Sequence, residues 1–167
     1  MIKLSRRLDY AILAVSHLAT RGRSTPLSAR ALADATRIPP AILANILKDL
    51  HRAALVRSAR GVHGGYELAV APEELSVGGL LRALEGDVRL VECVPSALAG
   101  VAAGGVAVGE TPSRSSCQIE SSCPIKAPLR RVHERIHEVL NGLTFDQLVA
   151  EAFAAPFAGP LAGPLAR

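Results

Sequence analysis

The sequence predicts a mainly α-helical fold with a small β-hairpin and one long helix in its C-terminal third. Aromatic residues are only 3% of the 167 residues and tryptophan is absent, so the core must be aliphatic, and abundant Ala and Leu favour helices. Apolar residues recur three and four positions apart along most of the chain, which is the helical period. Two short β-prone runs flank a glycine-rich stretch between residues 55 and 70. A chain of this length fits one domain with an appendage.

The first helix is expected to begin after Ser5, a good N-cap residue, and to run to about Thr20. Asp9 lies off its apolar face, in the first turn. A carboxylate in that position is stabilised by the helix dipole by roughly 0.3–1 kcal/mol. From the residues alone, this local role is sufficient to explain Asp9.

Two short helices around a tight turn follow. Ser28 is expected to cap the first of them, and Pro39-Pro40 to open the second, because a proline in the first turn lacks only an N–H that would have no partner there. The second helix has a buried apolar face and an exposed face that carries small, amide and basic residues: Ala41, Ala44, Asn45, Lys48 and Arg52. This arrangement is typical of a helix-turn-helix that contacts DNA.

The β-prone runs at residues 55–59 and 66–70 predict a hairpin directly after these helices, which is the position of a wing. Its tip carries Arg60 and His63 among three glycines, so the backbone can approach a phosphate or enter a narrow groove. Contacts to base edges are expected from Ala41, Asn45 and Lys48. The wing is expected to contact DNA through Arg60, His63 and Gly64, and phosphates are expected to be bound by Ser28 and Arg30.

The charge distribution agrees with a polyanion partner for the front half. Residues 1–70 hold 11 Lys/Arg against 4 Asp/Glu, a net 11 − 4 = +7, whereas residues 71–167 hold 8 against 11, a net −3. A basic half joined to a mildly acidic half favours double-stranded DNA as the partner of the basic half. Charge alone leaves open a basic surface that binds nothing.

The back half contains three further helical segments. Ser76 is expected to cap a helix from Val77 to about Leu84, and Thr144 opens a last helix to about Phe153 with a capping box. Between these, the longest helix is expected to start at Pro124 and to stop at Asn141-Gly142. Its apolar residues alternate four and three apart, as in a coiled-coil seam: Ile125, Leu129, Val132, Ile136 and Val139. His133 and His137 are expected on the polar face of this helix.

This pattern divides the chain into four parts. Residues 1–88 form a DNA-binding domain, residues 89–123 a cysteine-bearing sensor loop, residues 124–154 a dimerisation helix with a C-terminal helix, and residues 155–167 a disordered tail. The loop from Cys93 to Ser116 is rich in Gly, Ala and Ser and lacks periodicity.

Cys93, Cys117 and Cys123 are the only cysteines. The N-terminus lacks a signal peptide, and the longest weakly polar run, residues 94–109, is too short to span a membrane, so the chain is expected in the cytoplasm with no membrane partner. In a reducing compartment such cysteines hold a metal or cluster, react as thiols, or are inert, and their spacing leaves all three open. Cys123 precedes a helix start, where free N–H groups stabilise a thiolate.

An enzyme is not expected. His63-Gly64-Gly65 resembles an oxyanion-hole motif, but no G-x-S-x-G nucleophile elbow occurs. The phosphate-binding G-K-[ST] and G-x-G-x-x-G patterns are also absent.

Taken together, these features resemble the family of dimeric winged-helix regulators that includes IscR, NsrR and RirA, the Rrf-two family. The resemblance covers about residues 1–153. It is carried by the opening segment (residues 3–11), the start of the second short helix (residues 38–43), the wing (residues 56–66) and the three cysteines before a long helix (Cys93, Cys117 and Cys123).

The resemblance implies a homodimeric transcriptional regulator with the long helices side by side and one helix-turn-helix and wing on each half-site of an operator. It implies an iron–sulfur cluster held by Cys93, Cys117 and Cys123. In NsrR-like members the fourth ligand is an Asp at the place of Asp9, supplied by the partner protomer. IscR-like members use a His three residues after the last cysteine. This position is Lys126 here, so a His ligand of that kind is excluded.

The loop between the first two cysteines is longer than is usual in the family, which leaves the cluster type open between two-iron and four-iron (2Fe-2S or 4Fe-4S). The sequence therefore predicts a regulator that senses redox state, nitric oxide or iron. A cluster-free regulator, in which Cys117 and Cys123 form a disulfide, is the main alternative. A protein-interaction module that uses the coiled-coil seam and has no DNA role is the second.

Overall fold

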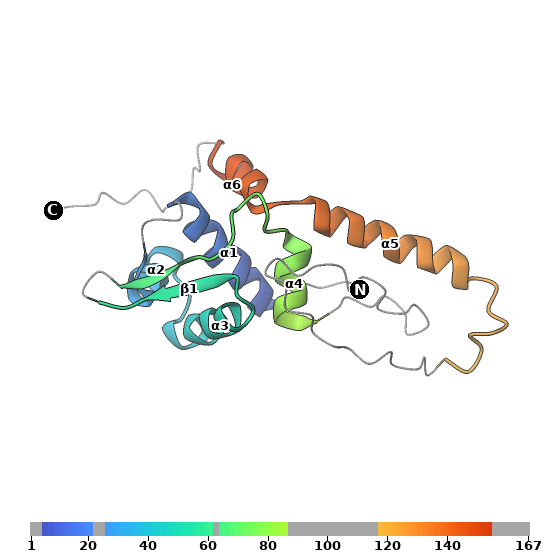
Figure 1. Ribbon diagram of the computed structural model, residues 1–167. Helices are drawn as coiled ribbons and strands as arrows, with labels where there is room; N and C mark the ends of the chain where they lie inside the picture. The colour runs from blue at the N-terminus through green and yellow to red at the C-terminus, as the bar shows by residue number, and fades with distance from the viewer. Residues whose placement is uncertain (1–4, 22–25, 62–63, 87–116, 155–167) are drawn as a thin grey trace.

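The computed structural model describes residues 5–21, 26–61, 64–86 and 117–154, and it is mainly helical with one two-stranded antiparallel sheet (Figure 1). In chain order the elements are α1 (Arg6–Thr20), α2 (Ala29–Thr36), α3 (Pro40–Arg52), β1 (Val56–Ala59), β2 (Gly65–Leu68), α4 (Val77–Glu85), α5 (Lys126–Gly142) and α6 (Phe145–Ala154). The predicted fold class is confirmed.

Among the described residues, the buried apolar cluster is aliphatic apart from Phe145. Helix α1 packs against α2, α3, α4, α6 and β2, so it lies at the centre of the folded part. Its Leu8, Ala11 and Val15 are fully buried, together with Leu47 of α3, and all lie in one continuous apolar cluster. Phe145, at the start of α6, is the largest of the fully buried side chains and joins the same cluster. The C-terminal helix is therefore anchored in the core that α1–α3 build.

Serine caps begin three of the helices where the sequence predicts them. The Ser5 Oγ accepts a hydrogen bond from Leu8 N at 3.1 Å, and the Ser28 Oγ accepts from Ala31 N at 3.1 Å. The Ser76 Oγ accepts from Gly79 N at 3.0 Å. Each cap satisfies an N–H that has no partner within its helix, and this fixes where the helix starts.

The wing is tied to the start of α2. Strands β1 and β2 pair from Val56–Leu68 to Ala59–Gly65. Beyond this ladder, Leu27 N donates to Tyr66 O at 2.9 Å and Tyr66 N donates to Leu27 O at 2.8 Å. This bridge requires a glycine at position 65, because a Cβ there would lie 2.4 Å from the Leu27 carbonyl carbon. Gly65 thus serves the packing of the wing on α2.

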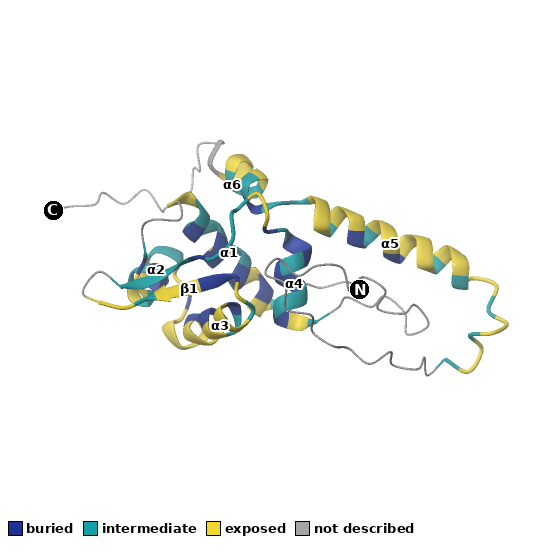
Figure 2. Cartoon of the chain, viewed as in Figure 1, coloured by how far each residue is buried: buried dark blue, intermediate teal, exposed yellow. Residues whose placement is uncertain are grey.

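Helix α5 extends away from the rest of the described fold and is attached to it at its C-terminal end (Figure 1). The helix crosses α4 at Gly78, where an added Cβ would lie 2.2 Å from the Asn141 Oδ1. Val77 N donates to Leu143 O at 2.9 Å, and Phe145 N donates to Leu75 O at 2.9 Å. Most of α5 is exposed (Figure 2).

Helix α5 starts later than the sequence analysis predicts. It begins at Lys126, and Cys123, Pro124 and Ile125 lie in the preceding turn. Pro128 explains the difference. In a helix starting at Pro124, Pro128 would lack the N–H that bonds the carbonyl of residue 124, and its ring would clash with that carbonyl. With Lys126 first, Pro128 falls among the first four residues, whose N–H groups have no helical partner.

The expectation that His133 and His137 lie on the polar face of α5 is wrong. Both are buried, and their ring centroids lie 4.3 Å apart. Their spacing places them on the same side of the helix as Leu140 and Asn141, which meet α4 at Gly78. The long helix therefore has a buried side, which carries the two histidines, in addition to the apolar seam.

Within the described residues, no helix combines the length and the apolar character needed to cross a membrane. The cysteine-bearing loop up to Ser116 lies outside the described residues. The tail from residue 155, for which the sequence predicts disorder, also lies outside them. The four-part division of the chain stays a prediction.

Candidate nucleic-acid interface and thiol turn

Helix α3 presents the face predicted to contact DNA. Leu43, Ile46, Leu47 and Leu50 are buried on one side. Ala41, Asn45 and Lys48 are exposed on the other, one turn apart. A small side chain, an amide and a cation, all exposed, suit the major groove, because Asn pairs with adenine and Lys with guanine or phosphate. The periodicity of the sequence predicts which side of α3 is buried, and the structure agrees.

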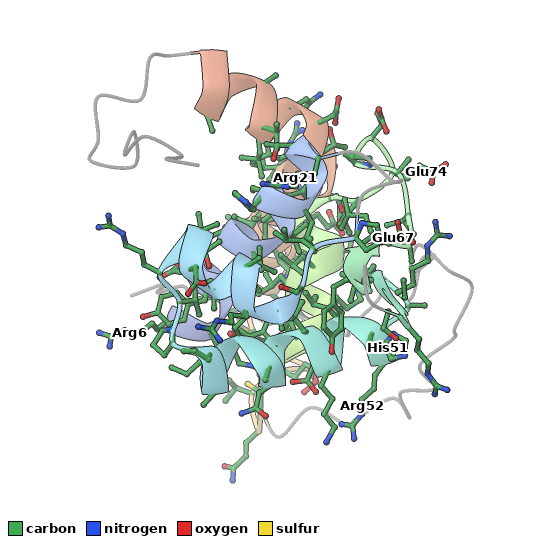
Figure 3. All side chains as sticks on the ribbon, turned by 90° about the vertical axis from the view of Figure 1, so that its left-hand side faces the viewer. Arg6, Arg21, His51, Arg52, Glu67 and Glu74 are labelled. Carbon is green, nitrogen blue, oxygen red and sulfur yellow. The ribbon has the colours of Figure 1, made fainter. Side chains whose placement is uncertain are left out.

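The C-terminal end of α3 is held against the wing. The His51 Nδ1 lies 3.2 Å from Val56 O, and Arg52 pairs with Asp49 at 3.6 Å. His51 and Arg52 lie beside the end of α3 at the wing side of the fold (Figure 3). Arg52 is largely exposed, so its cation is available to a phosphate next to the wing.

The described part of the wing carries cations. Arg60 is exposed at its tip, Gly64 is half-buried, and His63 lies outside the described residues. Arg57 faces Glu67 across the ladder, and its Nε donates to the Glu67 Oε1 at 2.7 Å. The alternation of the strand is the signal that identifies Arg57 as a second exposed cation of the wing, and the sequence analysis did not use it.

Ser28 and Arg30, expected on phosphates, are both exposed at the N-terminal end of α2. The Ser28 Oγ already accepts the capping hydrogen bond, so its hydroxyl hydrogen is the group left for a phosphate. The bridge between Leu27 and Tyr66 brings this end of α2 to the base of the wing. The structure thus places α2, α3 and the wing in one basic region.

Two of the three cysteines lie in a tight segment before α5, residues 117–125, here called the thiol turn. Cys117 and Cys123 are both half-buried, and neither is in a disulfide. Glu120 N donates to Cys117 O at 3.3 Å, and Lys126 N donates to Cys123 O at 3.4 Å. An ion pair of 2.8 Å from the Lys126 Nζ to the Glu120 Oε1 closes the turn onto the helix. Sequence reasoning missed this ion pair.

Within the described part of one chain, no three His, Cys, Asp or Glu side chains gather closely enough to hold a metal ion. Cys93 lies outside the described residues, so the set of three cysteines is not complete there. The two described thiols suit a soft metal or a cluster, since neither side chain is fully buried. Of the four predicted ligands, Cys117 and Cys123 lie in the described thiol turn.

Asp9 lies on the outer face of α1, and it is exposed. Leu13, one turn further on, is an apolar side chain that is 45% exposed. Asp9 and Leu13 thus share one exposed face of α1. This position is suitable for a ligand that acts on a neighbouring protomer.

At the other end of α1, His17 is half-buried, and its pKa is lowered from the ordinary value of 6.5. Burial, which disfavours the charged ring, is the main cause, and the nearby Arg21 cation adds to it. The neutral form of His17 is therefore favoured in the folded protein.

A helix-turn-helix pair followed by a β-hairpin is the winged helix-turn-helix arrangement, a class of proteins that contact DNA through the second helix and the hairpin. The family model described as iron-dependent transcriptional regulator, Rrf2, matches residues 4–151. The chain belongs to the Rrf2 family, as its resemblance in sequence predicts.

Individual relatives agree. A putative HTH-type transcriptional regulator of Synechocystis is 40% identical over 84 residues, which are 50% of this chain and 57% of that protein. The chain thus spans little more than half the length of this curated relative. The solved structure of IscR of T. potens is 25% identical, with a TM-score of 0.66 over 95% of this chain and 93% of that one.

CymR of B. subtilis, described as the global cysteine regulator, has a solved structure that is 23% identical, with a TM-score of 0.65 over 90% of this chain and 98% of that one. At this identity the likeness establishes the shared fold. The family and these relatives are transcriptional regulators and not enzymes, in agreement with the prediction from the sequence.

Proposed function

We propose that this protein is a homodimeric transcriptional regulator that binds an operator in double-stranded DNA and senses redox state, nitric oxide or iron through an iron–sulfur cluster. The observation that carries the DNA role is the exposed row of Ala41, Asn45 and Lys48 on a helix whose other side is buried. The wing and the α2 end extend this row with Arg60 and Arg30. A DNA partner also makes the cytoplasm the proposed place of action.

The dimer role follows from the apolar seam of α5. Ile125, Val132 and Val139 are 56%, 51% and 69% exposed, at the spacing of a coiled coil. A helix of 17 residues that is attached at one end gains little stability from its own hydrogen bonds. Pairing of the seam with that of a second copy would bury these residues. We therefore assign α5 to the dimer interface.

The proposed cluster ligands are Cys93, Cys117, Cys123 and, from the partner protomer, Asp9. Cys117 and Cys123 fit this role because they are half-buried cysteines in one turn at the outer end of the dimerisation helix. Asp9 fits because it is exposed on α1, where a second protomer can reach it. When bound, the cluster supplies iron that reacts with oxidants or nitric oxide.

The chain itself converts ligation into a change in DNA affinity. A carboxylate is a harder ligand than a thiolate and is displaced more easily, so Asp9 is the ligand expected to leave first. If Asp9 holds the cluster, its release would free α1 to shift against the partner's α5, and α3, which packs on α1, would move with it. A coupling of about 1–3 kcal/mol changes operator affinity roughly 5- to 150-fold.

The alternative is a cluster-free thiol regulator on the same fold. Two cysteines separated by five residues favour this possibility, since Cys117 and Cys123 lie in the same turn. Iron and acid-labile sulfide, measured per protomer after oxygen-free purification, decide between the two. A coloured protein with both elements supports the cluster. A colourless, iron-free dimer whose Cys117 and Cys123 oxidise to a disulfide supports the thiol regulator.

The DNA role has a separate experiment. Duplexes enriched by the protein from a random-sequence library provide an operator, and binding is then measured against salt concentration. Lys48→Ala and Arg60→Ala are each expected to weaken binding. If the replaced side chain contacts a phosphate, the slope of log K against log salt concentration becomes shallower by about 0.9. Arg135→Ala is the matched control, because Arg135 is 82% exposed on α5, away from α3 and the wing. Failure to enrich any duplex, or equal binding by all three variants, contradicts the DNA role.

A further inference from the structure

The first turn of α1 holds together the ends of two other helices. Arg7 donates from its Nη1 to Leu84 O at 3.0 Å, and its Nη2 pairs with the Asp49 Oδ2. Leu84 lies in the last turn of α4, and Asp49 lies in α3. The Ser5 Oγ also donates to the Glu85 Oε1, which adds a second contact between α1 and α4. These five residues form what we call the α1–α3–α4 junction.

The junction lies between the two halves of the proposed mechanism. Asp49 directly follows Lys48 in α3 and is one turn beyond Asn45, so its position depends on the orientation of the DNA-contacting face. Leu84 is two residues before Gly86, the last described residue before the segment that contains Cys93. Arg7 itself is two residues before Asp9.

A guanidinium suits this role because of its geometry. Its planar fork holds the two acceptors in a fixed relation, whereas a lysine ammonium is a point charge on a flexible stem. The Leu84 carbonyl is one of the last four carbonyls of α4, which have no helical partner, so the hydrogen bond from Arg7 also satisfies the end of that helix. A displacement of the α4 end or of α1 is thereby transmitted through one rigid group to Asp49.

From this geometry we infer that Arg7 is a positioning residue, which couples the state of the cysteine-bearing region to the orientation of α3. The inference rests on the proposed function, which it deepens by naming the link between sensor and DNA-contacting helix. It requires no contact between Arg7 and either DNA or a cluster. It predicts that replacing Arg7 changes how far operator affinity depends on the sensor, more than it changes operator affinity itself.

The experiment compares full-length wild type, Arg7→Met and Arg6→Met. Operator affinity is measured on a duplex enriched from a random library, once with protein purified without oxygen and once after oxidation and iron chelation. The ratio of the two dissociation constants is the readout. Arg6→Met is the matched control, because Arg6 is the neighbouring arginine and is exposed at the outer surface of α1 (Figure 3).

In Arg7→Met the ratio of the two dissociation constants is expected to move toward 1 by roughly 2- to 30-fold, the range seen for residues within coupling networks. In Arg6→Met the ratio should stay at the wild-type value. Iron content and visible absorption of Arg7→Met should match those of the wild type. Asp49→Asn, which removes the charge at the α3 end and keeps the α4 end, should shift the ratio in the same direction. It also provides the test if Arg7→Met does not fold.

A ratio in Arg7→Met within twofold of the wild-type ratio overturns the inference, and so does an equal loss of affinity in both states, which indicates a purely structural role. Failure of the proposed function is seen separately, in the wild type. If no duplex is enriched, or if the wild type binds its operator equally in both states, both the proposed function and the coupling role of Arg7 are rejected.

Discussion

Gly65→Ala tests the attachment of the wing to α2. In the structure a Cβ at position 65 would lie 2.4 Å from the carbonyl carbon and oxygen of Leu27, where 3.4 Å or more is ordinary contact. The obstructing atoms are backbone, so no side-chain rotation relieves the clash. The strand must withdraw by about 3.4 − 2.4 = 1.0 Å. This lengthens the two hydrogen bonds between Leu27 and Tyr66, now 2.9 and 2.8 Å, beyond hydrogen-bonding distance.

Two such hydrogen bonds contribute about 1–3 kcal/mol. Alanine also restricts the unfolded chain, which offsets about 0.4–1 kcal/mol. The expected net loss in the free energy of unfolding is therefore about 1–2 kcal/mol. Urea unfolding followed by circular dichroism, at one fixed protomer concentration, measures it.

Gly142→Ala is the control for the Gly65 variant, because nothing lies within 4 Å of its added Cβ at the end of α5. It should leave stability unchanged or raise it by up to about 1 kcal/mol. Equal unfolding midpoints and slopes for Gly65→Ala and wild type would falsify the argument for this close approach.

Three further predictions concern α1 and α5. The pKa of His17 is lowered in the folded protein, so the unfolded chain binds protons more readily, and the free energy of unfolding should fall as pH drops below about 6.5. His17→Gln should reduce the dependence of the free energy of unfolding on pH, and an equal dependence in the variant and the wild type contradicts this prediction. Val139→Glu puts a charge on the seam and should shift the protein toward monomer in light scattering, whereas Glu138→Gln should not; an unchanged dimer removes the seam from the interface. Asp9→Ala should alter the visible absorption of protein purified without oxygen, and an unaltered spectrum at equal iron content excludes Asp9 as a ligand.

Local chemistry was enough to predict much of the fold. Ser5, Ser28 and Ser76 are caps because a hydroxyl before an apolar repeat satisfies a free N–H whatever the rest of the chain does. The buried side of α3 follows from the helical period in the same way, and with it the exposure of Asn45 and Lys48.

Other features depend on partners that are distant in the sequence. Arg7 and Asp49 are 42 positions apart, and nothing in either neighbourhood indicates their pairing. The burial of His133 and His137 likewise depends on tertiary packing, which overrides the apparent polarity of their side of α5. The start of α5 is different, because Pro128 was visible in the sequence and excludes a helix that begins at Pro124.

The candidate site was predicted unevenly for the same reason. Spacing and residue type identify Cys117 and Cys123 and a helix after them, and the structure adds the ion pair from Lys126 to Glu120 that closes their turn. The placement of Cys93 and His63 lies outside the described residues, so their assigned roles stay predictions.

The one-ended attachment of α5 gives the molecule a lever. Its 17 residues span about 25 Å at 1.5 Å per residue, with the crossing at Gly78 near one end and Cys123 just beyond the other. A tilt of about 5° at that crossing displaces the far end by about 2 Å, since the displacement is the length multiplied by the angle in radians. A sub-ångström rearrangement between Gly78 and Asn141 is thus magnified at the thiols. In the opposite direction, a displacement of the thiols by about 2 Å requires a tilt of only about 5° at the crossing.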